Sequence, residues 1–203
     1  MNQKRNQGKV MSKSVSRSKA QEPVEKINLS LDALIEDLSS RNDEERVKAR
    51  HSLVAKGKAA VPSLIEALKN KNYLTRWEAA KSLGEIGDPE AAPALVKALE
   101  DEEFDVRWLA AEGLIKMNIN ALRPLLKALE YQGDSALLRE GAHHVFHDLT
   151  KGGLRKYLVP VLAALEALEH GREVPWAAPH EMAVEVPQAA RRALEMLERK
   201  KKF

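Results

Sequence analysis

Apolar and small residues recur along the chain with a period of about 31 residues. Each period begins with an arginine, which is followed by an alanine three residues later and a large apolar residue seven residues later. A proline and a leucine-rich segment come next. The arginines are Arg46, Arg76, Arg107 and Arg139, and the large apolar residues are Leu53, Leu83, Leu114 and Phe146. A fixed period of this length is typical of stacked repeats that bury their apolar faces against one another.

Each period predicts a pair of helices. In the first helix, alanine and a larger apolar residue lie four residues apart and share a face. Asn42, Asn72 and Ser135 suit the N-cap position, and Asp101 is expected to serve where Glu103 stands. The helix should end where a residue accepts the left-handed backbone, at Gly57, Gly87 and Asn118. A proline then fits the first turn of the second helix, which needs no backbone donor.

These features predict an all-α fold, a right-handed α-solenoid of about four to five helix pairs. Residues 28–168 carry the repeats, and residues 30–38 supply an N-terminal cap helix. No segment shows the alternation of a half-buried strand, so no sheet is expected. Outside the repeats we expect a disordered basic tail over residues 1–27, an irregular loop over 169–187 and a C-terminal capping helix over 188–203 that covers the last repeat.

The fourth period is longer than the others. Its arginine and its proline are 21 residues apart, against 16 or 17 residues in the first three periods. Insertions in solenoids map to loops on one face, often the binding face. The inserted segment carries the basic and aromatic residues Lys151, Arg155, Lys156 and Tyr157, which are therefore candidates for binding a partner. The alternative is a longer turn without a role.

Other candidates for partner binding lie on the second helices and in the loop. The second helices are expected to line a concave surface and to present Lys97 and Lys127 there, and the irregular loop carries Trp176. Trp77 and Trp108 each follow a repeated arginine. We interpret both tryptophans and the arginines as contacts between neighbouring repeats, because a residue repeated in every unit usually serves the stacking. The alternatives are an aromatic anchor for a partner and a basic rail for an anion.

Five of the six histidines lie between residues 143 and 180. His143 and His147 are four residues apart on the fourth first helix, so their imidazoles share a face. That spacing can chelate zinc or iron, with His180 or Glu181 as a third ligand. However, the sister repeats carry Ala80 and Gly84 at the positions of His143 and His147, which indicates packed sites. We therefore expect structural histidines, no metal and no cofactor.

The segment from Arg76 to Ala91, RWEAAKSLGEIGDPEA, resembles the HEAT-like repeats named after phycobilisome (PBS) lyases. The resemblance implies the helical solenoid described above. Such repeats also occur in bilin lyases, in the metal-dependent deoxyhypusine hydroxylase and in scaffolds with no catalytic role. The hydroxylase has a His-Glu pair directly after the repeated arginine, and this chain has none there; its His180-Glu181 lies outside the repeat. We find no bilin lyase motif to carry over.

Composition narrows the classes of function. The absence of cysteine excludes disulfides, cysteine-ligated metals and a cysteine nucleophile. No apolar run reaches 18 residues, so we expect no membrane insertion and a cytoplasmic protein. The net charge is +3, but residues 1–20 carry six basic and no acidic side chains, whereas residues 21–198 sum to −7. The basic character thus belongs to the ends of the chain. Met11 is an alternative start.

Together these observations favour a non-enzymatic HEAT-repeat scaffold or adaptor that binds another protein on its concave or loop face. One alternative is an enzyme of the PBS-lyase or metal-dependent hydroxylase kind. The other is nucleic-acid binding through the basic tails, which would weaken steeply with salt.

Overall fold

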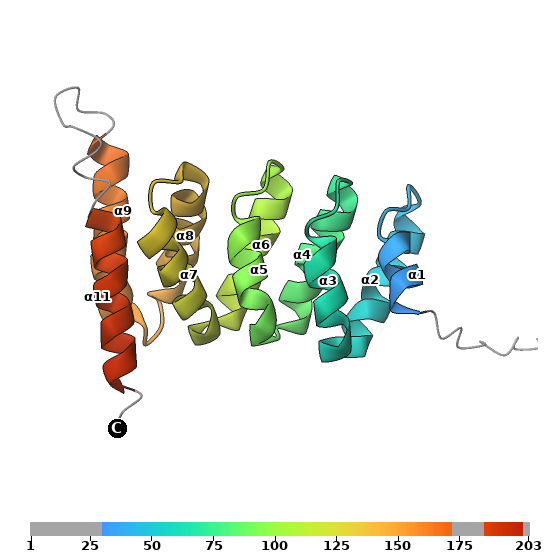
Figure 1. Ribbon diagram of the computed structural model, residues 1–203, viewed down its shortest axis with the longest axis horizontal. Coiled ribbons are helices and arrows are strands. Elements are labelled where there is room, and N and C mark those ends of the chain that lie inside the picture. The colour runs from blue at the N-terminus through green and yellow to red at the C-terminus, as the bar shows by residue number, and fades with distance from the viewer. Residues whose placement is uncertain (1–29, 172–184, 201–203) are drawn as a thin grey trace, which may run out of the picture.

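The computed structural model describes residues 30–171 and 185–200, which form helices joined by short turns (Figure 1). No strand occurs in this part of the chain, in agreement with the predicted all-α solenoid. The helices are α1 (Leu31–Asp37), α2 (Asp43–Lys56), α3 (Val61–Ala67), α4 (Tyr73–Ile86), α5 (Ala92–Ala98), α6 (Phe104–Met117), α7 (Ile119–Gln132), α8 (Ala136–Leu149), α9 (Arg155–Gly171) and α11 (Glu185–Lys200).

The helices stack in two layers along the length of the molecule (Figure 1). The first helices α2, α4, α6 and α8 each have 14 residues and form one layer. The second helices α3, α5 and α7, preceded by the cap helix α1, form the other layer. Short 3-10 helices at Gly57–Ala60 and Pro89–Ala91 lead into α3 and α5. None of the helices in the described ranges is long and apolar enough to cross a membrane.

The predicted helix ends are confirmed except for the N-cap of the third repeat. Asn42, Asn72 and Ser135 each accept a hydrogen bond on the side chain from a backbone N–H of the following first turn. In the third repeat the N-cap is Glu103, whose side chain makes no capping hydrogen bond. Asp101, which was expected to serve there, instead accepts the backbone N–H of Glu103 at 2.9 Å. The helix-ending residues Gly57, Gly87 and Asn118 have positive φ angles of 57°, 69° and 53°. Asparagine tolerates this backbone better than most non-glycine residues, which explains its place in the third repeat.

The core runs between the two layers as one continuous cluster of buried Ala, Leu and Val side chains. The first helices α4 and α6 pack closely where Gly84 faces Gly113. A Cβ atom added to Gly84 would lie 3.0 Å from the Gly113 Cα. The paired glycines therefore let two neighbouring first helices approach each other backbone to backbone.

The repeated arginines fasten each repeat to the one before it, as the stacking interpretation predicts. Arg46, Arg76, Arg107 and Arg139 each donate a hydrogen bond to the backbone carbonyl six residues earlier. These carbonyls lie in the turns that follow the preceding second helices. Arg76 also forms a salt bridge with Asp101 of the next repeat at 2.7 Å, and this hydrogen bond raises the pKa of the arginine. The guanidinium groups therefore serve the inter-repeat turns.

A buried cluster of charges joins the first two repeats between α2 and α4. Glu78 is 1% exposed and lies between two arginines of α2. Its carboxylate is 3.0 Å from Arg50 Nε and 3.5 Å from Arg46 Nε. Arg50 also contacts the more exposed Glu85 at 2.6 Å. The Arg50 Nε and Glu78 Oε2 atoms approach as an ion pair without hydrogen-bond alignment, so their attraction is mainly electrostatic.

The C-terminal end of the solenoid differs from the prediction. The sequence pattern places the helix after Pro160 beside α7, as the second helix of the fourth repeat. In the structure α9 instead packs on α8, and α11 takes the position beside α7 (Figure 1). Arg123 of α7 pairs with Glu198 of α11, and Glu130 of α7 pairs with Arg191. The insertion lengthens the turn after α8. The longer turn lets α9 pack on α8, away from the position that a regular second helix would take beside α7.

The segment boundaries also differ. α9 continues to Gly171, past the predicted start of the irregular loop at residue 169. α11 begins at Glu185, three residues before the predicted capping helix at 188. The predicted basic tail over 1–27 and the centre of the loop, with Trp176 and His180, lie outside the described residues.

Candidate functional site: a groove between α6 and α8

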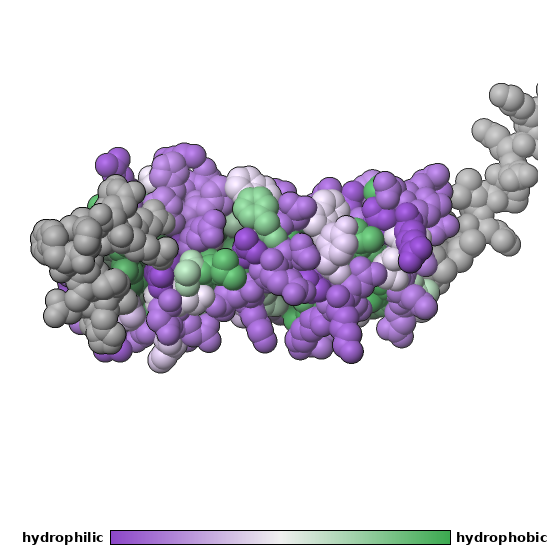
Figure 2. Space-filling view, turned by 90° about the horizontal axis from the view of Figure 1, so that it is seen from above, coloured by the Kyte–Doolittle hydropathy of each residue, from purple (hydrophilic) through white to green (hydrophobic). Residues whose placement is uncertain are grey.

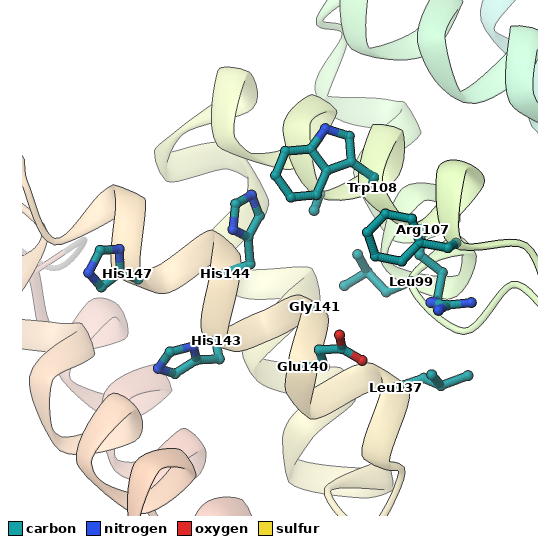
Figure 3. A pocket seen from close by; sticks show the side chains of 11 residues that line it. Leu99, Arg107, Trp108, Leu137, Glu140, Gly141, His143, His144 and His147 are labelled. Carbon is teal, nitrogen blue, oxygen red and sulfur yellow. The ribbon is translucent and has the colours of Figure 1, made fainter. Parts of the chain in front are cut away.

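An open groove of about 460 Å³ lies between the first helices of the third and fourth repeats. It is largely apolar and aromatic, and three histidines of α8 line its far side (Figure 3). We call it the aromatic groove. The residues that form it include Leu99, Phe104, Trp108, Leu137, Gly141 and His144. From outside, the molecule is mostly hydrophilic with small hydrophobic patches between the repeats (Figure 2).

The floor of the aromatic groove exists because α8 carries a glycine where the other first helices carry larger residues. Gly141 aligns with Lys48, Glu78 and Leu109 of the sister repeats. A Cβ atom at this position would lie 2.9 Å from the Leu99 side chain. The absence of a side chain thus brings α8 close to Leu99 and leaves an apolar floor.

Two aromatic residues of α6 form the near wall of the aromatic groove. Phe104 and Trp108 are 57% and 46% exposed, and their ring centroids are 6.3 Å apart. They lie four residues apart on one helix, so both rings face the same side. Trp108 also contacts the ring of His144 across the groove, at 4.7 Å between centroids (Figure 3). Large exposed aromatic surface of this kind is typical of binding sites.

The two tryptophans, which align between repeats, therefore differ in their surroundings. Trp77 is half-buried against the core, with the Lys81 ammonium 4.6 Å from its ring centroid. This agrees with the predicted stacking role. Trp108 does contact the next repeat through His144, yet about half of its surface stays open to solvent. The sequence interpretation missed Phe104 and the exposure of Trp108.

The histidines of α8 point to different carboxylates. His144 Nε2 lies 3.4 Å from Glu112 of α6, on the side of Trp108. His143 projects away from Trp108 (Figure 3), and its Nε2 lies 3.7 Å from Glu166 of α9. The rings of His143 and His147 are near-parallel, with centroids 6.3 Å apart. Within residues 30–171 and 185–200, no three side chains form a metal-binding group.

We therefore expect purified protein to carry less than about 0.1 equivalent of zinc or iron, and a chelator to leave its melting temperature unchanged. The reason is that His143 and His147 lack a third ligand in the described structure, and a stable zinc site needs at least three. Elemental analysis of the purified chain checks this. A stoichiometric metal that disappears in a His143→Ala, His147→Ala double variant would contradict it.

The four basic and aromatic residues of the inserted segment do not form one exposed surface. Tyr157 is 5% exposed and belongs to the core, so it must be removed from the partner-binding candidates. The sequence pattern assigned Tyr157 to the inserted loop, but residue 157 belongs to the first turn of α9, which directs its ring into the core. Lys151 pairs with Asp148 of the preceding turn. Arg155 and Lys156 are exposed, and the Lys156 ammonium lies 5.0 Å from the Tyr157 ring centroid.

Lys97 and Lys127 lie together in a second hollow. They come from neighbouring second helices, α5 and α7, and line an open groove of about 610 Å³. We call it the lysine groove. It lies on the opposite layer from the aromatic groove, since α5 and α7 are second helices and α6 and α8 are first helices (Figure 1).

The comparisons with known proteins bear on the fold. A family model for HEAT repeats matches residues 31–115. Residues 31–115 of this chain are therefore HEAT repeats. The match covers the cap helix α1, the first two repeats and most of α6, and the same helix-pair architecture continues beyond it through α7.

The chain also resembles a solved structure. It is similar to a crystal structure of an engineered protein from the Northeast Structural Genomics Consortium, with 16% identity and a TM-score of 0.41 over 80% of each chain. No curated protein sequence matches it.

Proposed function

We propose that this HEAT-repeat protein is a non-enzymatic scaffold or adaptor that binds another protein, and that the aromatic groove holds apolar side chains of that partner. The observation that carries the proposal is the exposure of Phe104 and Trp108 beside an apolar floor. Tryptophan and other aromatic anchors dominate the energy of protein interfaces when they are buried by a partner. HEAT repeats commonly serve as interaction scaffolds, which fits this use.

The geometry of the aromatic groove favours binding a protein segment over catalysis. Three of its polar side chains have partners within the fold: His144 with Glu112, His143 with Glu166, and Arg107 with backbone carbonyls of Asp101 and Glu102. Glu140 and His147 are the other polar side chains that line it. What the groove offers to a partner is mainly apolar and aromatic area. Such area contributes about 25 cal/mol per Å² when it is removed from water.

A Phe104→Ala, Trp108→Ala double variant is expected to lose its bound partner. We expect the amount of partner recovered with the tagged variant from native lysate to fall by about tenfold or more, because two central anchors are removed. Quantitative mass spectrometry of the co-purified proteins, wild type against variant, measures this. The helical circular dichroism signal should remain, since both side chains are largely exposed.

The matched control is Ile119→Ala, which truncates an apolar side chain that is 56% exposed at the start of α7 and outside both grooves. This variant should recover the same proteins as the wild type. If the double variant also recovers the same proteins in the same amounts, the aromatic groove is not the binding surface.

A further inference from the structure

The lysine groove brings two lysines from neighbouring second helices into one hollow. Lys97 and Lys127 are exposed, and neither makes an ion pair with any residue in the described ranges. The lining also holds Arg123, which pairs with Glu198, and one carboxylate, Glu100, which accepts a hydrogen bond from Ser135 and keeps its charge. The two lysines thus leave this hollow with an excess of positive charge, within a body whose residues 21–198 carry a net charge of −7.

The lysine groove also presents an apolar and aromatic wall. Tyr131 of α7 is 77% exposed, which makes it the most exposed large apolar or aromatic side chain of the described residues. Pro93, at the start of α5, and Pro124, inside α7, line the same hollow, so the sequence expectation of a proline in the first turn is wrong for α7. Tyrosine provides contact area at low entropic cost because it has few rotatable bonds. The hollow therefore combines positive charge with a rigid aromatic contact.

We propose that the lysine groove binds an acidic segment of a second protein that carries an aromatic or large apolar side chain. The carboxylates of the segment pair with Lys97 and Lys127, and its apolar side chain packs against Tyr131 and the prolines. Charge complementarity favours this occupant, because two lysines without ion pairs outnumber the one carboxylate, Glu100, that lines the groove.

Two other occupants fit the groove less well. Residues 1–20 of this chain carry six basic side chains and no acid, so they would be repelled. A nucleic acid requires several phosphate contacts from a row of cations, whereas this groove offers two lysines, an arginine already paired with Glu198, and the carboxylate of Glu100.

This binding is independent of the proposed use of the aromatic groove, because the two hollows lie on opposite layers of the solenoid (Figure 1). Both can be occupied together. The arrangement would let the chain hold two proteins at once, which is the defining property of an adaptor.

The test uses the full chain and a peptide array in which acidic, neutral and basic sequences each carry a central phenylalanine. We expect binding to the acidic peptides to exceed binding to the neutral ones by about tenfold. A Lys97→Glu, Lys127→Glu double variant should lose that preference, and Tyr131→Ala should weaken binding to the acidic peptides. The control Lys116→Glu, at an exposed lysine of α6 in the other layer, should bind as the wild type does.

Several outcomes would overturn the proposal. One is equal binding of acidic and neutral peptides, and another is unchanged binding by the double variant. Tighter binding of single-stranded RNA than of acidic peptide, lost in the same variant, would identify a nucleic-acid site instead. A concentration-dependent dimer in sedimentation that the double variant abolishes would identify a second copy of the chain as the occupant.

Discussion

Replacing Glu78 with alanine is expected to lower the free energy of unfolding by about 3–5 kcal/mol, the largest single effect that the structure predicts. The carboxylate is 1% exposed and lies between Arg50 and Arg46, both held on α2. Its removal leaves two guanidinium groups at a buried interface with less negative charge to compensate them. Chemical denaturation followed by circular dichroism measures the loss.

Glu85→Ala is the matched control for this change. Glu85 also contacts Arg50, at 2.6 Å, but its side chain is 30% exposed and water can replace it. We expect a loss of about 1 kcal/mol or less, as for ion pairs at the surface. Equal losses for Glu78→Ala and Glu85→Ala would show that burial does not determine the energy of this cluster.

Leu83→Ala is expected to destabilise the protein by about 2–4 kcal/mol, and by more than Leu34→Ala. Both side chains are buried, at 0% and 2% exposure. Leu83 belongs to α4, which packs on α2, α3, α5 and α6, whereas Leu34 belongs to α1, which packs on α2 and α3. A cavity in a central repeat weakens the interfaces on both of its sides.

The comparison of the two leucine variants is measured by urea denaturation, with the midpoint and the slope fitted separately. The slope should stay similar if both variants unfold as the wild type does. Equal losses, or a larger loss for Leu34→Ala, would contradict the assignment of α4 to the centre and α1 to the end of the stack.

The repeat architecture could be predicted from the sequence because local rules determine it. The position of each repeated arginine, the caps at Asn42 and Asn72, and the positive φ angles at Gly57 and Asn118 all follow from single residues and their spacing. These features involve contacts within one repeat or between neighbours, which the period itself reveals.

The packing of the last two helices could not be predicted in the same way. The leucine pattern after Pro160 matches a second helix, yet α11 lies beside α7 and α9 does not. The choice depends on contacts between distant segments, such as Arg123 with Glu198 and Gly133 with Pro187. No local feature of the sequence determines which of the two amphipathic helices, α9 or α11, packs beside α7.

The aromatic groove was missed for a related reason. Trp108 occupies the same repeat position as Trp77, so the sequence pattern alone assigns both residues to contacts between neighbouring repeats. The difference comes from the next repeat. There α8 has Gly141 where the other first helices have larger residues, so a groove remains between α8 and Trp108. That substitution was visible in the sequence, and it was the one signal that pointed to a hollow beside Trp108.

The central claim is that the chain binds a protein through the aromatic groove, and site-specific photocrosslinking tests it most directly. Benzoylphenylalanine would replace Phe104 in the groove or, as a control, Tyr73, which holds the same position one repeat earlier and is 48% exposed. After irradiation in cells, we predict a covalent protein adduct at position 104 and none at position 73. No adduct at position 104, or the same adduct at both positions, would contradict the account.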